Sequence, residues 1–155
     1  MSQNASILIA EDDAGHFALV KKNLWRTCVV SEINHFRDGE ELLQFLFSKT
    51  PGACISSGHD YLLLLDIRLP GKDGIEVLRI IKEDMELRKI PVIMLTTSSD
   101  PADIDRCYEL GCSAYIKKPR DYTDFMEAVE FLGQVLSIPE FMWPSIHEEE
   151  IGCTG

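Results

Sequence analysis

Positive charge is scarce in this sequence of 155 residues. There are 15 lysines and arginines against 26 aspartates and glutamates, which gives a formal net charge of −11. A surface with this balance repels the phosphate backbone of DNA and RNA over most of its area. We therefore expect no direct contact with nucleic acid.

Long hydrophobic runs are also missing. No apolar stretch approaches the roughly 20 residues that span a bilayer, and residues 1–6 lack the basic and apolar regions of a signal peptide. We expect no membrane insertion and a cytoplasmic location. With 45% hydrophobic residues, the chain still has enough apolar side chains for the core of one domain.

Cysteine and histidine lack the spacing that is typical of a metal site. The five cysteines form no CxxC pair and most lie within apolar segments, so we interpret them as reduced thiols without a chemical role. The histidines are scattered, and we interpret them as ordinary surface or core residues rather than catalytic bases. They are His16, His35, His59 and His147.

Short apolar runs recur along the chain, and longer segments of helical periodicity separate them. The predicted strands are Ile7–Ala10, Val29–Ile33, Tyr61–Leu65, Val92–Leu95 and Ala114–Ile116. The third and fourth runs indicate central parallel strands covered on both faces, whereas Ser31 and Glu32 interrupt the second run and indicate an edge strand. Because parallel neighbours need right-handed crossovers, the pattern predicts a doubly wound α/β fold with five strands and five helices.

Local signals mark where several helices begin and end. Asp38 is followed three residues later by a glutamate, as in a capping box, and Asp100 precedes a first-turn proline. Gly111 is predicted to end the helix that begins there. The last helix, from about Asp121, has one apolar stripe. Its members are Phe125, Val129, Leu132 and Leu136.

Polar groups capable of chemistry follow four of the predicted strands. They are Glu11, Asp12 and Asp13 after the first strand, Asp66 after the third, Thr96 and Thr97 after the fourth, and Lys118 and Pro119 after the fifth. Ligands of open α/β sheets bind beyond the carboxyl ends of the strands, so we expect these groups to converge. Carboxylates brought so close repel one another and need a cation. Oxygen ligands suit Mg²⁺, whereas Zn²⁺ prefers nitrogen and sulfur.

The charges of this predicted site balance. Glu11, Asp12 and Asp66 contribute −3, and Lys118 together with Mg²⁺ contributes +3. An ionised Asp66 in such a site can attack phosphorus in line and form an aspartyl phosphate.

Each of these residues also has an ordinary interpretation when taken alone. Acidic residues after a strand often cap the next helix, and Asp66 could simply occupy a turn. Thr96 could be a β-former at a strand end, and Lys118 a solvated surface charge. The convergence of four strand ends on one crevice favours the chemical interpretation.

Four segments together resemble the receiver domain of two-component response regulators. They are ILIAEDD, LLLLDIRLPGKDG, IPVIMLTTSSD and YIKKP. The resemblance spans roughly residues 6–136, with residues 1–5 as a short extension and 137–155 as a C-terminal tail. The segments LPGKDGIEVL and LTTSSDPADIDRCYELG are most similar to stand-alone regulators that are paired with phytochrome kinases. The resemblance implies a flavodoxin-like three-layer sandwich with strand order 2-1-3-4-5.

The resemblance also implies a role for each residue at the strand ends. The phosphorylation residues are Asp66 as phosphoacceptor, Thr96 as switch hydroxyl, Tyr115 as switch aromatic, Lys118 as phosphoryl contact and Thr97 through its backbone amide. The Mg²⁺ ligands are Asp12, Asp66, the backbone carbonyl of Arg68 and, through water, Glu11. Asp13 is a flanking acid, and the peptide bond before Pro119 is expected to be cis.

The implied function is that of a response regulator in a phosphorelay. It takes a phosphoryl group from a sensor histidine kinase, for which the subfamily suggests a phytochrome, and signals through phosphorylation-dependent protein contacts. A histidine phosphotransfer protein is left open as a further partner. Homodimers are expected through the fourth helix, fifth strand and fifth helix, to which Phe141 and Trp143 of the tail could add. The alternative is that these apolar side chains only cover their own core.

Three other classes of protein share parts of this pattern. Aspartate-nucleophile phosphatases need a second Asp two residues after the nucleophile, where Arg68 stands here, so we expect no enzyme acting on external substrates. A flavodoxin-like cofactor binder would present its phosphate to residues 11–13, which are all acidic and would repel it. A phosphate-independent scaffold is disfavoured because the acidic residues, the acceptor, the threonine and the lysine are all present.

Overall fold

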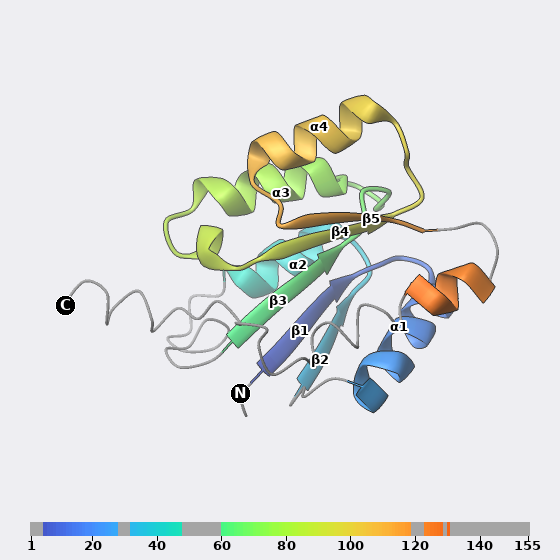
Figure 1. Cartoon of the computed structure of the whole chain (residues 1–155). Coiled ribbons are helices and arrows are strands. Elements are labelled where there is room, and N and C mark those ends of the chain that lie inside the picture. The colour runs from blue at the N-terminus through green and yellow to red at the C-terminus, as the bar shows by residue number, and fades with distance from the viewer. Residues whose placement is uncertain (1–4, 28–31, 48–59, 119–122, 129, 131–155) are drawn as a thin grey trace, which may run out of the picture.

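The computed structural model describes residues 5–27, 32–47, 60–118, 123–128 and 130. Five parallel strands form one sheet in the order β2-β1-β3-β4-β5 (Figure 1). The strands are β1 (Ala5–Ala10), β2 (Glu32–Phe36), β3 (Asp60–Leu65), β4 (Val92–Thr96) and β5 (Ala114–Lys117). The helices are α1 (Ala14–Thr27), α2 (Gly39–Leu46), α3 (Gly74–Glu83) and α4 (Pro101–Leu110), with the 3₁₀ helix η1 (Leu87–Lys89) after α3. The predicted fold and strand order are confirmed.

Each face of the sheet has its own hydrophobic core, because successive strand side chains point to opposite faces. On one face, Leu63 and Met94 belong to a buried cluster with side chains of α2, α3 and α4. On the other face, Leu64 and Ile93 belong to a cluster with side chains of α1 and with Phe125. Figure 1 shows the resulting three layers. Burying each large apolar side chain stabilises this arrangement by roughly 1.5–3 kcal/mol.

The predicted starts of two helices and the predicted end of one are confirmed. Asp38 accepts a hydrogen bond from the backbone N–H of Glu41 at 2.8 Å, ahead of α2. Asp100 accepts one from the N–H of Ala102 at 3.0 Å, ahead of α4. Gly111 ends α4 with φ of 107°, a left-handed conformation that favours glycine.

The predicted bounds of the second strand are wrong. The strand β2 ends at Phe36, three residues beyond the predicted end, while residues 29–31 lie outside the described part of the chain. The apolar run misled the prediction because an edge strand is covered less completely than a central one. Polar Asn34 and His35 therefore fit within β2, and Phe36 is its buried residue.

The last predicted helix is described only in part. Residues 123–128 are helical, and Phe125 is buried as its place in the apolar stripe predicts. The other three members of the stripe, Val129, Leu132 and Leu136, lie outside the described residues.

Two predictions drawn from composition can be compared with the structure. Among the described residues, no helix is long and apolar enough to cross a bilayer. Cys107 and Cys112 are free, buried thiols, and burial raises the pKa of Cys107 to about 12. Cys107 therefore stays protonated at neutral pH, which agrees with a thiol that has no chemical role.

Candidate functional site

The parallel register brings the ends of β1 and β3 to the same level. Ala10 pairs with Leu65, so Glu11 and Asp66 are the next residues on adjacent strands. The backbone N–H of Asp66 donates to the carbonyl of Ala10 at 3.1 Å, which continues the ladder one step beyond the strands. Glu11 and Asp66 are both buried at this edge of the sheet.

Lys118 approaches the two acids from the end of β5. Its backbone N–H donates to the carbonyl of Thr96 at 2.6 Å, which ties the residue to β4. Its ammonium donates to Asp66 Oδ2 at 3.1 Å and to Glu11 Oε1, and the side chain is only 2% exposed. An unpaired ammonium at this depth would cost several kcal/mol, so the two carboxylates are what makes its burial tolerable.

Both oxygens of the Asp66 carboxylate accept hydrogen bonds. Oδ2 accepts from Lys118, and Oδ1 accepts from the backbone N–H of Arg68 at 3.1 Å. The segment that follows folds back tightly, because the N–H of Gly74 donates to the carbonyl of Ile67 at 2.8 Å. These contacts hold the Asp66 carboxylate in one orientation.

Glu11, Asp12 and Asp66 form an oxygen cluster at this edge. Each offers one carboxylate oxygen, and the three atoms lie within 4.8 Å of one another. Burial raises the pKa of Glu11 to about 7, although the hydrogen bond and charge of Lys118 act in the opposite direction. An all-oxygen set of this kind fits Mg²⁺, and a bound cation would favour the ionised form of Glu11.

Asp13, the third acid after β1, has a structural role. Asp13 Oδ1 accepts a hydrogen bond from the backbone N–H of His16 at 3.0 Å, and its carbonyl accepts from Phe17 at 3.0 Å. The bond from His16 lowers the pKa of Asp13. The capping interpretation thus applies to Asp13, while Glu11 and Asp12 remain with the site.

A chain of hydrogen bonds connects β5 to α4 through the loop after Thr96. The Thr96 hydroxyl is buried and accepts from the N–H of Ser98 at 3.4 Å. Tyr115 donates its hydroxyl proton to the carbonyl of Ser98 at 2.8 Å, and the Ser98 hydroxyl donates to Asp103 at 2.7 Å. A change at Thr96 can reach Tyr115 and the first turn of α4 through this loop.

Two further predicted positions follow β4 and β5. Thr97 lies directly after β4 and is exposed. The peptide bond before Pro119, which was expected to be cis, lies outside the described residues.

The sequence interpretation missed two histidines that touch the site. His16 Nδ1 lies 3.3 Å from the ammonium nitrogen of Lys118. His35 Nε2 donates to the backbone carbonyl of Glu11 at 2.8 Å, and its ring stacks on Phe17 with 3.6 Å between ring centroids. No sequence signal reveals these contacts, because isolated histidines on a helix and an edge strand show no ligand spacing.

Comparison with known proteins identifies a family and several similar proteins. The model of the response regulator receiver domain matches residues 7–130. The response regulator Rcp1 of Synechocystis sp. is 37% identical over 124 residues, which cover 80% of this chain and 83% of Rcp1. The Mn²⁺-bound form of Rcp1 is a solved structure with a TM-score of 0.77 and 31% identity, covering 90% of this chain and 99% of that chain.

Two other solved structures are similarly close. A response regulator receiver domain from Rhodospirillum rubrum has a TM-score of 0.81 at 40% identity and covers 90% of this chain and 97% of that chain. The phosphorylated cyanobacterial phytochrome response regulator RcpA has a TM-score of 0.78 at 32% identity, with 90% and 98% covered. Phytochrome-associated regulators are therefore among the relatives of this protein. By the family match, the identity and the shared fold, the chain belongs to the response regulator receiver domain family of two-component systems.

Proposed function

We propose that Asp66 accepts a phosphoryl group from a sensor histidine kinase, and that the phosphorylated protein signals through contacts with other proteins. The observation that carries this proposal is the buried Asp66 carboxylate, oriented by Lys118 and by the N–H of Arg68 beside two further acids. A phytochrome is the kinase that we propose, because RcpA is a phytochrome response regulator. A histidine phosphotransfer protein stays open as a second partner.

The residues proposed to hold Mg²⁺ are Asp12, Asp66, the backbone carbonyl of Arg68 and, through water, Glu11. Support comes from the three carboxylate oxygens within 4.8 Å of one another and from the Mn²⁺ ion that Rcp1 binds. When bound, the ion supplies positive charge that offsets the charge of the transferring phosphoryl oxygens. With Glu11 ionised, the three carboxylates and Lys118 together carry a net charge of −2, which matches a divalent cation.

In the proposed step, an oxygen of Asp66 forms a bond to phosphorus while the bond from phosphorus to the donor breaks. The bonding electrons leave with the donor, which is a kinase histidine or, in a test tube, the acetate of acetyl phosphate. Lys118 can then contact a phosphoryl oxygen while it keeps its bond to Glu11. The Thr96 hydroxyl and the Thr97 backbone amide are the proposed contacts for the remaining oxygens.

Acetyl phosphate tests this proposal directly. We expect the protein to gain the mass of one phosphoryl group when acetyl phosphate and Mg²⁺ are both present, measured by intact mass. A chelator should prevent the gain, because the carboxylates alone repel the incoming phosphate. A protein that stays unmodified at saturating Mg²⁺ would contradict the proposal. Hydrolysis of a generic phosphoester over many turnovers would instead support a phosphatase that acts on external substrates.

The switch that follows phosphorylation needs more than one contact. A hydrogen bond from Thr96 to a charged group contributes roughly 1.5–3 kcal/mol, whereas inverting a 1:99 population takes about 5.5 kcal/mol. We propose that Lys118 and the Thr97 amide supply much of the rest, and that Tyr115 moves toward the space that Thr96 leaves. The bond from Tyr115 to Ser98 supports this coupling, because it joins β5 to the loop that carries these groups.

Thr96→Ala is expected to accept the phosphoryl group but to lose the structural response. Without the hydroxyl, the loop at Ser98 loses one of its contacts to the phosphate, so NMR shifts of Ser98 and Tyr115 on phosphorylation should shrink by more than about half. Thr97→Ala is the matched control, since its side chain is exposed and only its backbone amide is used. A full response from the Thr96 variant would exclude this switch.

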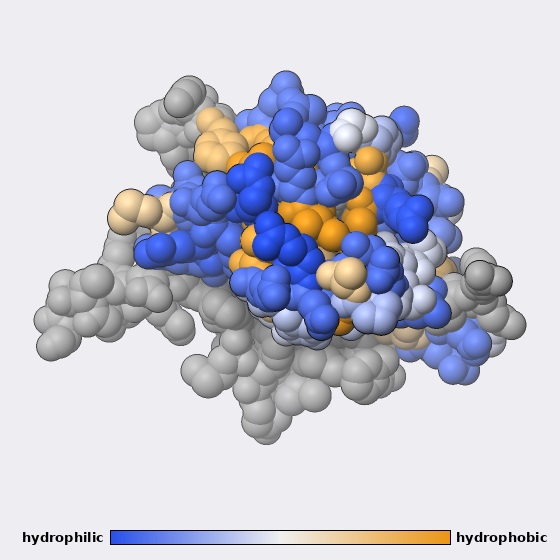
Figure 2. All heavy atoms as spheres, turned by 90° about the horizontal axis from the view of Figure 1, so that it is seen from above, coloured by the Kyte–Doolittle hydropathy of each residue, from blue (hydrophilic) through white to orange (hydrophobic). Residues whose placement is uncertain are grey.

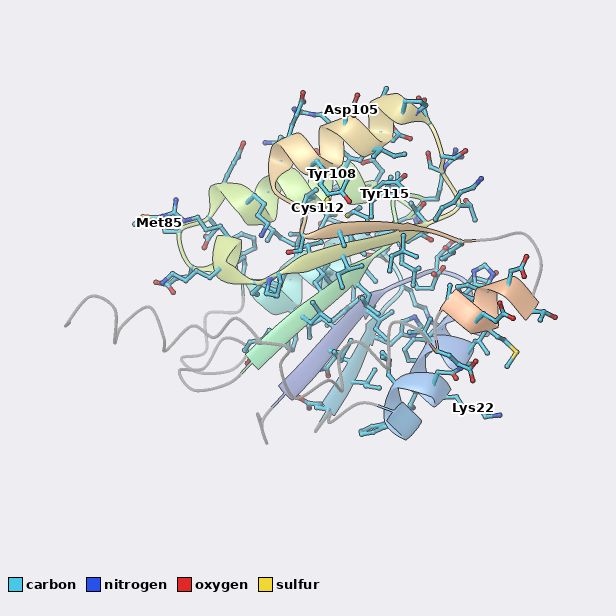
Figure 3. The ribbon with its side chains drawn as sticks, viewed as in Figure 1. Lys22, Met85, Asp105, Tyr108, Cys112 and Tyr115 are labelled. Carbon is cyan, nitrogen blue, oxygen red and sulfur yellow. The ribbon has the colours of Figure 1, made fainter. Side chains whose placement is uncertain are left out.

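We further propose homodimers through α4, β5 and the helix that contains residues 123–128. Tyr108 projects from α4 with 50% exposure, on the same side of the sheet as Tyr115 (Figure 3). From above, a small hydrophobic area shows among mostly hydrophilic atoms (Figure 2). The helix also carries Asp105 and Arg106, opposite charges that a two-fold interface can pair.

Sedimentation tests the dimer. We expect the sedimentation coefficient to rise with concentration across the micromolar range, and Tyr108→Ser to shift this rise to higher concentration by removing an exposed ring from the interface. A strictly monomeric profile, with and without phosphorylation, would remove the dimer proposal.

Several sequence predictions remain part of the proposal without a structural test. They are the division into residues 1–5, 6–136 and 137–155, the absence of nucleic-acid contacts and of activity on external substrates, and the cytoplasmic location. Phe141 and Trp143 lie outside the described residues.

A further inference from the structure

The ammonium of Lys118 has three protons to donate and three acceptors around it. Two acceptors are the carboxylates of Glu11 and Asp66, and the third is Nδ1 of His16 at 3.3 Å. His16 comes from α1, 102 positions earlier in the sequence, so the third contact is made by the fold and not by local geometry. With this contact, the buried ammonium is fully hydrogen-bonded.

The chemistry of the two groups sets the direction of this hydrogen bond. An ammonium is a donor only, so Nδ1 of His16 is the acceptor in the contact with Lys118. The carboxylates of Glu11 and Asp13 lie farther from Nδ1, both at 3.9 Å. The shorter distance to Lys118 therefore decides the role of Nδ1.

An acceptor nitrogen without negative charge does something that a carboxylate cannot. Glu11 and Asp66 orient Lys118 but also neutralise the charge that a phosphoryl group is meant to meet. His16 restricts the ammonium without cancelling its charge, so the full positive charge stays available when Lys118 exchanges Asp66 for a phosphoryl oxygen. In that state Glu11 and His16 are the two protein groups left to position it.

The ring of His16 is itself held from two sides. Its backbone N–H donates to the cap residue Asp13, which places the side chain at the start of α1. Its ring meets that of Phe125 edge-on, with 5.0 Å between the ring centroids. Phe125 is buried in the helical segment 123–128, so the ring cannot swing away from Lys118 without losing a core contact.

We propose that His16 is a positioning residue of the phosphorylation site, which holds the Lys118 ammonium by accepting one of its protons at Nδ1. This inference rests on the proposed phosphorylation of Asp66 and adds a residue that the acidic cluster, the threonine and the lysine do not include. The contacts of the His16 side chain with charged groups are those to Lys118, Glu11 and Asp13, so it acts through Lys118.

The test compares His16→Ala with His16→Asn. The amide oxygen of asparagine can take the place of Nδ1, whereas alanine offers no acceptor. With acetyl phosphate and Mg²⁺, we expect His16→Ala to be phosphorylated about threefold to tenfold more slowly than wild type, the effect of one lost hydrogen bond. His16→Asn should stay within about twofold of wild type. The side chain of His16 is 39% exposed, so both variants should fold, which urea unfolding would verify.

A second measurement does not depend on phosphorylation. In wild type, the buried Lys118 ammonium should give a slowly exchanging ¹H–¹⁵N signal, because all three protons are bonded. This signal should broaden or vanish in His16→Ala and return in His16→Asn. An unchanged signal and rate in His16→Ala, or an asparagine variant as impaired as the alanine variant, would overturn the role of His16. A wild-type protein that never accepts phosphate would instead refute the proposed function, while the Lys118 signal would still decide this inference.

Discussion

Asp66→Asn is expected to abolish the Mg²⁺-dependent phosphoryl adduct. The amide that replaces the carboxylate is a poor nucleophile, and it also removes one of the three charged oxygens of the proposed metal cluster. Intact mass after incubation with acetyl phosphate should show only the unmodified chain. Folding should survive, because Lys118 keeps Glu11 and an amide oxygen can still accept its proton.

Asp13→Asn is the matched control for this variant. It makes the same change in net charge at the residue next to Asp12, and asparagine caps a helix about as well as aspartate does. Asp13 lies outside the group of three oxygens, so its variant should be phosphorylated at close to the wild-type rate. A phosphoryl adduct on Asp66→Asn would show that another residue is phosphorylated. An equal loss of phosphorylation in both variants would show that the change in net charge, and not the loss of the nucleophile, causes the effect.

Gly74→Ala is expected to be strongly destabilising. A Cβ at this position would lie 2.1 Å from the carbonyl oxygen of Asp66 and 2.8 Å from the Cα of Ile67. Both neighbours are backbone atoms that cannot rotate away, so the start of α3 has to shift relative to Asp66. We expect a loss of about 3 kcal/mol in the free energy of unfolding, at the upper end of overpacking effects. Phosphorylation of the folded fraction should also slow, since Asp66 would be displaced.

Gly71→Ala separates crowding from conformation. Gly71 has φ of 74°, but a Cβ there would meet nothing within 4 Å. The cost is then that of left-handed backbone alone, roughly 1–2 kcal/mol. Urea unfolding of both variants would measure the two effects. Equal midpoints would show that the close approach to Asp66 does not dominate at Gly74.

Much of the site follows from the sequence because parallel strands share a register. Once the apolar runs are strands of one doubly wound sheet, the residues after β1, β3, β4 and β5 have to lie along the same edge. The structure brings Glu11, Asp66 and Lys118 into contact there, and Thr96 lies beside them. Helix caps at Asp38 and Asp100 are also local, because each depends on a few consecutive residues.

The sequence was less informative where the surroundings of a strand decide its extent. The strand β2 includes Asn34 and His35, which a search for apolar runs passes over. An edge strand needs only part of its surface buried, so its limits depend on what it pairs with. Here it pairs with β1 from Ser6 onward.

By itself, then, the sequence determined the fold class and the identity of the acidic, hydroxyl and lysine groups at one edge, because periodicity and chain order are local properties. The strand order came from the resemblance to receiver domains. Only the tertiary structure decided which hydrogen bonds those groups make. It separated Asp13, which caps α1, from Glu11, which meets Lys118, and it placed His16 against Lys118 across 102 positions of sequence. Contacts of that range depend on how helices pack on the sheet, and no spacing along the chain records them.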